Sequence, residues 1–104
     1  MSRQAKEDRR YPRPLPDVRR AAQMALIGLA WSWNPTQDGG FDAVCVSKFL
    51  KYKDEVQIRF HSAGGTLVRI QSISKSGLID FGQNKKHIRE FFDQLDNQLT
   101  GTFR

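Results

Sequence analysis

The fold is decided by the stretch Val56-Gln57-Ile58-Arg59-Phe60-His61-Ser62-Ala63-Gly64-Gly65-Thr66-Leu67-Val68-Arg69-Ile70-Gln71-Ser72-Ile73-Ser74-Lys75. Apolar and polar side chains alternate on both sides of an Ala-Gly-Gly turn, which is the pattern of two β-strands joined by a tight connection. A connection this short makes the strands antiparallel, because a parallel crossover needs a dozen or more residues. The stretch therefore predicts a β-hairpin.

Two more strands are predicted upstream of this hairpin. Trp31-Ser32-Trp33 alternates as a short strand does, and residues 41 to about 52 are rich in β-branched and aromatic side chains. Residues 34–40 read as a turn of Asn, Pro, Asp and Gly. Lys53-Asp54-Glu55 is expected to be a second tight polar turn, in which the two carboxylates are solvated.

Two amphipathic helices are predicted on either side of the strands. One covers roughly residues 16–30 and follows the start signals Pro16 and Asp17, and the other runs from about Asn84 to Leu99. Each helix has one apolar stripe, so both are expected to pack on the same face of the sheet. The sequence thus predicts an α+β, two-layer fold: a four-stranded antiparallel meander with an N-terminal and a C-terminal helix on one face.

The chain has 104 residues, a length that allows one domain, and its formal charge is +6. We expect that domain at residues 17–100, a tail at 101–104, and a basic, proline-rich arm at 1–16 that is disordered alone. Deleting the arm is expected to leave the melting temperature nearly unchanged. The arm would dock on an acidic partner through a set of cations and one aromatic side chain: Arg3, Arg9, Arg10, Tyr11 and Arg13.

Other side chains argue against several kinds of site. The single cysteine, Cys45, lies in an apolar run, so it is expected to be buried and no disulfide framework exists. His61 and His87 are far apart and lack metal-spaced neighbours, so we predict neither a metal nor a cofactor. No apolar run approaches the ~20 residues that span a bilayer, and no signal peptide is recognisable. The expected location is the cytoplasm or the stroma or matrix side of an organelle, free or peripheral to a membrane.

The junction between the last strand and the last helix is unusually polar. With Asn84 as the expected N-cap, Lys85, Lys86 and His87 occupy the first turn, where each cation costs ~0.3–1 kcal/mol. A bound phosphate or carboxylate would reverse that sign. The hypothetical anion site consists of Ser72, Ser74, Lys75, Asn84, Lys85 and Lys86. In the structural alternative, Gly77 and Gly82 form the turn and Asp80 supplies the missing acid.

The same junction resembles the signature of the domain-of-unknown-function family DUF1499, Arg-Ser-x-Ser-Arg-x-Gly-x-x-Asp-x-Gly-x-Asn-x-x-Arg-Ile. The positions in register are Ser72, Ser74, Gly77, Asp80, Gly82, Asn84 and Ile88, whereas the three Arg positions hold Gln71, Lys75 and His87. Upstream, Asp42-Ala43 and residues 52–59 are also similar, so the resemblance covers about Asp17 to Leu95. The family has no assigned activity. Its occurrence in photosynthetic lineages, often at membranes, implies a peripheral subunit of a membrane-associated complex.

Three classes of function follow from these observations. The favoured one is a non-enzymatic binding or assembly module whose arm makes protein–protein contacts with a larger assembly or docks on an acidic membrane surface. A nucleic-acid-binding accessory protein is the second, because the arm is basic, although its aromatic content is low. The third is an enzyme acting on a small anionic substrate at the junction, for which no nucleophile and base are suitably spaced.

Overall fold

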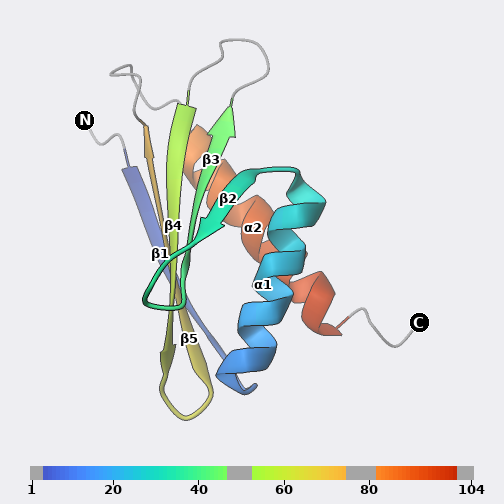
Figure 1. Cartoon of the computed structure of the whole chain (residues 1–104). Coiled ribbons are helices and arrows are strands. Elements are labelled where there is room, and N and C mark those ends of the chain that lie inside the picture. Colours follow the sequence, from blue (N-terminus) through green and yellow to red (C-terminus); the bar gives the residue numbers. More distant parts are fainter. Residues whose placement is uncertain (1–3, 47–52, 75–81, 101–104) are drawn as a thin grey trace.

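The computed structural model describes residues 4–46, 53–74 and 82–100, and it has two layers, a sheet and a pair of helices (Figure 1). The elements in chain order are β1 (Gln4–Tyr11), α1 (Leu15–Leu29), β2 (Ser32–Pro35), β3 (Phe41–Val46), β4 (Lys53–Ser62), β5 (Thr66–Ser74) and α2 (Gln83–Thr100). All strand pairs are antiparallel, in the order β1-β5-β4-β3-β2. The predicted α+β class is confirmed, with five strands in place of four.

Strands β2 to β5 form the predicted meander. In the central hairpin, Ile58 pairs with Ile70 and Ser62 with Thr66, as the alternation and the short connection require. Gly65 is needed at the turn because its φ is +121° and an added Cβ would lie 2.5 Å from the carbonyl oxygen of Tyr11. The hairpin turn therefore packs directly against the end of β1.

The fifth strand is the main correction to the sequence prediction. In place of the expected arm, Gln4–Tyr11 pairs with β5 along its whole length, from Gln4 opposite Ile73 to Tyr11 opposite Thr66. Side chains of β1 alternate between exposed and half-buried, so the strand has an inner face although it is rich in charge. Composition could not reveal this, because ordering of the segment depends on a partner strand far away in the sequence. Residues 101–104, the expected tail, lie outside the described residues.

One boundary correction bears on the site. Lys53-Asp54-Glu55 is not a turn but the start of β4, paired with Val44, Cys45 and Val46 of β3. Asp54 is in phase with Val56 and Ile58 and is 2% exposed, so it points into the interior and is not solvated. Residues 47–52, expected to complete the preceding strand, lie outside the described residues.

The core lies between the inner face of the sheet and the two helices (Figure 1). The largest fully buried side chains include Phe41 on β3 and Phe91 and Phe92 on α2, and burying each contributes ~1.5–3 kcal/mol. Cys45 is buried and free, as expected. Within the described residues, no helix is long and apolar enough to cross a membrane.

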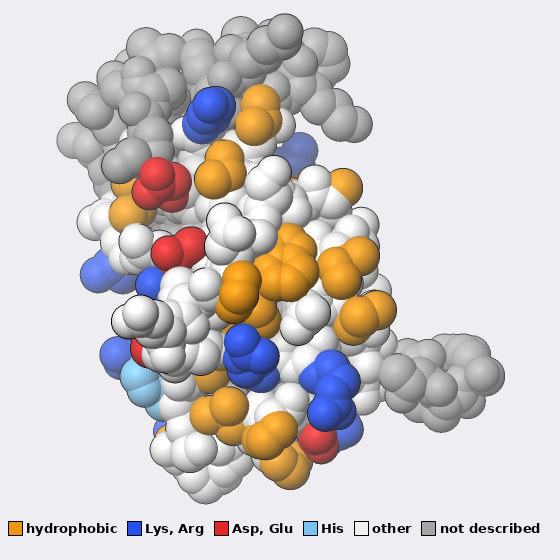
Figure 2. Space-filling model, in the orientation of Figure 1, with side chains coloured by type: hydrophobic (Ala, Val, Ile, Leu, Met, Phe, Trp, Pro, Cys, Tyr) orange, Lys and Arg blue, Asp and Glu red, His pale blue; other side chains and the backbone are white. Residues whose placement is uncertain are grey.

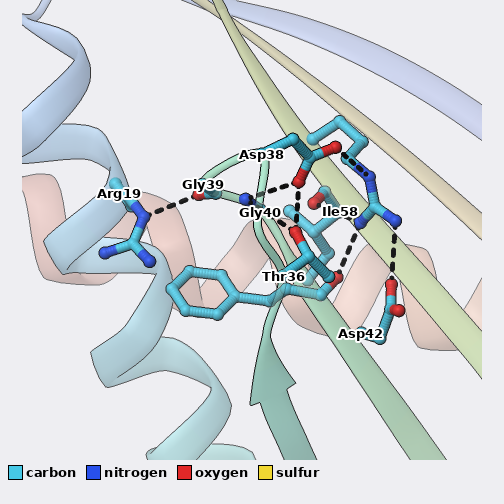
Figure 3. A network of polar contacts seen from close by, with 9 residues as sticks. Arg19, Thr36, Asp38, Gly39, Gly40, Asp42 and Ile58 are labelled. Carbon is cyan, nitrogen blue, oxygen red and sulfur yellow. Dashed lines mark hydrogen bonds and ion pairs between the residues drawn. The ribbon is translucent and has the colours of Figure 1, made fainter.

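The turn between β2 and β3 is held by two arginines (Figure 3). Arg59 on β4 forms ion pairs with Asp38 (3.1 Å) and Asp42 (3.0 Å). Arg19 on α1 donates to the carbonyl of Gly39 at 2.6 Å. Hydrogen bonds from Thr36 and from the backbone of Gly40 lower the pKa of the Asp38 carboxyl. Arg59 and Arg19 thus serve to fix this turn.

Candidate functional site

At the strand–helix junction, three buried polar side chains bind one another. Ser72 donates to Oδ1 of Asn84 at 2.6 Å, and Nδ2 of Asn84 donates to Oγ of Ser74 at 2.9 Å. Ser72 and Asn84 are fully buried and Ser74 is 6% exposed. Buried polar groups are costly unless hydrogen-bonded, and here the amide of Asn84 satisfies both hydroxyls. This triad therefore ties β5 to α2.

Helix α2 begins differently from the expectation. Its first residue is Gln83, and the carbonyl of Gly82 accepts the bond from the amide of Lys86 at 3.0 Å. Gly82, with φ of +96°, is therefore the residue that caps the helix, and Asn84 is already inside it. Lys85 and Lys86 are exposed on the first turn.

The members of the hypothetical anion site thus divide into two groups. Ser72, Ser74 and Asn84 come together in the interior, whereas Lys85 and Lys86 lie at the surface. Lys75, Gly77 and Asp80 lie outside the described residues. The end of β5 and the start of α2 thus lie together, as the sequence predicts, but the serines and Asn84 point inward whereas the two lysines point outward.

An Asp–His pair beside this triad was missed by the sequence analysis. His87 turns inward, and its Nε2 lies 2.9 Å from Oδ2 of Asp54; the two side chains are 15% and 3% exposed. The ring of Trp31 meets that of His87 edge to face at 5.8 Å. The signal was present, because Asp54, Val56 and Ile58 share one phase of the β4 alternation.

In the described part of the chain, the pair has a buried thiol nearby but no cluster of metal ligands. Cys45 lies opposite Asp54 on β3, and burial, with added repulsion from Asp54 and Glu90, raises the pKa of its thiol. A raised pKa keeps the thiol protonated and unreactive. Among the described residues, no group of three or more His, Cys, Asp or Glu side chains is placed to hold a metal.

A hollow of about 250 Å³ lies between β1 and the first half of α2. We call it the basic groove; its lining residues are Ala5, Lys6, Glu7 and Arg9 of β1 and Lys85, Ile88 and Arg89 of α2. Arg9 was predicted as part of the arm and Lys85 as part of the junction. The fold brings these two separately predicted features to the same place.

The cations of the basic groove differ in how they are paired. Arg9 is neutralised by Glu7 at 3.0 Å and by Asp96 at 3.2 Å, and its guanidinium lies 4.4 Å from the ring centre of Phe92. Over the described ranges 4–46, 53–74 and 82–100, no carboxylate pairs with Lys6, Lys85 or Arg89. Arg9 is therefore a fixed part of the wall, while three exposed cations remain available.

Most of the expected docking residues of the arm bind the rest of the same domain. The hydroxyl of Tyr11 donates to Oδ1 of Asp96 at 2.6 Å, and Arg9 donates to the other oxygen of that carboxylate. Arg10 donates to the carbonyl of Ala63, and Arg13 to that of Leu99. Arg3 lies outside the described residues. The contact of β1 with α2 is therefore what holds the two walls of the groove together.

Tyr11 gives this contact a pH dependence. Burial, together with the hydrogen bond to Asp96 and its charge, raises the pKa of the Tyr11 hydroxyl above its ordinary value of 10.0. A raised folded-state pKa means that the contribution to stability is fully present below pH 10 and is lost as the pH rises further.

We expect Tyr11→Phe to lower the free energy of unfolding by about 1 kcal/mol at neutral pH, because a hydrogen bond to a carboxylate is lost. The difference from the parent protein should shrink above pH 10, where the parent loses the contribution of Tyr11. Urea unfolding of both proteins at neutral and alkaline pH measures this. A difference that stays constant with pH would contradict the assignment, since all other titrating groups are common to the two proteins.

Comparison with solved structures supports the two-layer architecture. The crystal structure of Ara h 8.0201 matches with a TM-score of 0.51 at 8% identity, over 93% of this chain and 97% of that chain. The crystal structure of TTHA0849 from Thermus thermophilus matches with a TM-score of 0.51 at 13% identity, over 97% of this chain and 99% of that chain. At such identities the likeness establishes the fold alone.

Comparison by sequence gives a family. A search of curated proteins finds no match. The family described as "Protein of unknown function (DUF1499)" matches residues 3–95, which include β1 and the basic groove as well as the strand–helix junction. The chain therefore belongs to the DUF1499 family, as the resemblance at the junction predicted.

Proposed function

We propose that this protein is a non-enzymatic binding module that takes an acidic partner in the basic groove between β1 and α2. The observation that carries the proposal is the group of three exposed, unpaired cations, Lys6, Lys85 and Arg89, around a hollow of about 250 Å³ in the described part of the chain. The proposed docking surface is therefore a groove within the fold, and not the free arm that the composition predicts.

The electrostatics favour an anionic occupant. Cations at the same hollow repel one another, and Lys85 lies in the first turn of α2, where the helix dipole adds ~0.3–1 kcal/mol of unfavourable energy. The first turn of α2 contains no acidic residue to offset this. Carboxylates or phosphates of a partner would offset both the repulsion among the cations and the unfavourable interaction with the helix dipole. They would also raise the association rate.

Two other acidic surfaces, a membrane and a nucleic acid, fit the groove less well, and for the membrane the reason is the position of the exposed apolar side chains. The large hydrophobic side chains exposed among the described residues are Met24, Ile27 and Val46; Figure 2 shows hydrophobic side chains interspersed with Lys and Arg on one face. Met24 and Ile27 belong to α1, which does not line the groove. The apolar side chains that could insert into a bilayer therefore lie on a different element from the free cations, whereas membrane-surface binding needs both on one face. A peripheral subunit of a membrane-associated assembly, as the family resemblance implied, remains one setting for a protein partner.

Nucleic acid is the other alternative. The open face of the sheet contains arginines, but Arg69 pairs with Asp8 at 3.2 Å and Arg59 pairs with two aspartates. Neutralised cations contribute little to the counterion release that drives nucleic-acid binding. The unpaired cations gather at one small hollow and do not extend over the open face, which favours a short acidic segment of a protein over an extended phosphate backbone.

The test is binding of a fluorescent oligoglutamate peptide, followed by anisotropy at low and at physiological salt. Lys85→Glu and Arg89→Glu should each weaken binding about tenfold, which corresponds to ~1.4 kcal/mol. The matched control is Lys86→Glu, which changes the same charge on the same helical turn but does not line the groove. It should change binding about twofold at most.

Each contrary result has a definite meaning. Equal losses for Lys85→Glu and Lys86→Glu would show that only net charge matters and would contradict a groove. Single-stranded RNA and vesicles containing an acidic lipid are tested in parallel. If either binds more tightly than oligoglutamate and is equally sensitive to Lys85→Glu, the acidic-protein assignment is wrong.

A further inference from the structure

The basic groove runs along an open edge of the sheet. β1 is the first strand in the order β1-β5-β4-β3-β2, so it has a strand neighbour on one side, and no described strand pairs with its other side. An unpaired edge presents a row of backbone N–H and C=O groups that can accept a further strand. Eight residues of β1 are paired with β5, so the backbone is extended and can act as a template over that length.

The position of the groove relative to β1 follows from its lining. β5 pairs with β1 along its whole length, yet no β5 residue is among the residues that line the groove. The hollow therefore lies on the side of β1 away from β5, at the open edge. Its second wall is one face of α2, because Lys85, Ile88 and Arg89 are three and four residues apart.

The two walls run in the same direction. Ala5 and Lys6 line the groove together with Lys85 and Ile88, whereas Tyr11, further along β1, binds Asp96, further along α2. The view in Figure 1 agrees with this parallel course of β1 and α2. An extended chain laid against the edge of β1 would therefore follow α2 as well.

Resting on the proposed function, we propose that the partner is an extended acidic segment of another protein, which binds as a sixth strand on the open edge of β1. Its backbone pairs with β1, and its acidic side chains at alternate positions face Lys85 and Arg89. An edge strand flanked by a helix is a recurrent arrangement for binding peptides by strand addition. The occupant is thus recognised by two features, an extended backbone and a repeated negative charge.

The spacing of the cations predicts a sequence pattern for the partner. Lys85 and Arg89 are four residues apart on a helix, which is about 6 Å along the axis. Residues on the same side of a strand recur every ~6.6 Å. Acidic residues separated by one residue therefore match the two cations, whereas a sequence without any such pair does not. Lys6, on the outer face of β1, would contact the residues between them.

The charges on β1 itself fit this role. Lys6, Glu7, Asp8, Arg9 and Arg10 are consecutive charged residues on an edge strand, the kind of sequence that discourages pairing with a copy of the same strand. The unpaired cations beside that edge select a partner of opposite sign. The same edge is thus protected against self-association and open to an acidic chain.

The test uses a synthetic parent peptide in which Glu alternates with Val, and two N-methylated versions of it. One version is methylated on the odd-numbered residues and the other on the even-numbered residues. In a strand, alternate N–H groups point to the neighbour, so methylation of one set should weaken binding at least about tenfold. Methylation of the other set should have little effect, because those N–H groups face solvent. A peptide of the same composition built from Glu-Glu-Val-Val repeats has no two Glu residues separated by one residue, so it should also bind less tightly. Hydrogen exchange of the β1 amides should slow when the unmethylated peptide binds.

The outcomes separate this inference from the proposed function. If both methylated peptides bind as tightly as the parent peptide while Lys85→Glu still weakens binding about tenfold, the groove binds acids but strand addition is wrong. If no acidic peptide binds at all, the proposed function itself fails. If the β1 amides become protected with protein concentration alone and sedimentation shows a dimer, the edge serves a second copy and the inference is overturned.

Discussion

A variant that lacks residues 1–11 is expected to lose more than about 3 kcal/mol of its free energy of unfolding, a large part of the ~5–15 kcal/mol that domains possess. The deletion removes a strand that is paired with β5 over eight residues. It also removes Tyr11 and Ala5, which pack against the core, and the guanidinium of Arg9 that covers Phe92. The expectation from composition was the opposite, that the melting temperature would hardly change.

Urea and thermal unfolding measured by circular dichroism test this result, with removal of residues 1–3 as the matched control. The short deletion leaves β1 intact and should change the melting temperature by no more than ~2 °C, whereas the long one should lower it by well over ~10 °C. If the protein lacking residues 1–11 has the same melting temperature as the parent protein, the pairing of β1 with β5 contributes nothing to stability.

Replacing His87 with Leu is expected to have the second-largest effect, a loss of about 3 kcal/mol. Asp54 is 2% exposed, and its Oδ1 has no hydrogen-bond partner among the described residues, so the bond from Oδ2 to His87 is the one that the variant removes. A buried carboxylate left without its partner costs several kcal/mol, because water can no longer solvate it.

The double variant Asp54→Val with His87→Leu tests whether the unpaired carboxylate causes this loss of stability. Removing both polar partners removes the desolvation cost, so the double variant should be more stable than His87→Leu alone. Val also suits a strand position between buried neighbours. His61→Leu is the control, because His61 is exposed on β4. A double variant no more stable than the single one would show that packing of the imidazole, not the carboxylate, determines the loss.

The elements that the sequence predicted well are those whose evidence is local. The alternation on each side of Gly64 and Gly65 identified the hairpin of β4 and β5, and the apolar spacing within residues 16–30 and 84–99 identified both helices to within one residue at each end. These periodicities arise because side chains repeat every 2 residues in a strand and every 3.6 in a helix, whatever the partner. The junction motif similarly identified the family.

Part of the site was also within reach of the sequence. Ser72 and Ser74 share the inward phase of β5, and their contact with Asn84 follows from placing the strand end beside the helix start. Asp54 has the same kind of signal, since it is in phase with Val56, but three consecutive polar residues at positions 53–55 also favour a turn. The buried position of Asp54 is stable only because His87 supplies a partner from another element.

Local pattern by itself thus determined the hairpin, the helices and the two-layer class of this protein. Tertiary structure alone decided that residues 4–11 become an edge strand, because the hydrogen bonds that order them are supplied by β5, some 60 residues away in the sequence. It also decided that Lys6 and Lys85, at opposite ends of the chain, lie on one groove. Periodicity reports which way a side chain points, whereas proximity depends on which elements pair, and pairing is determined by the free energy of the whole fold.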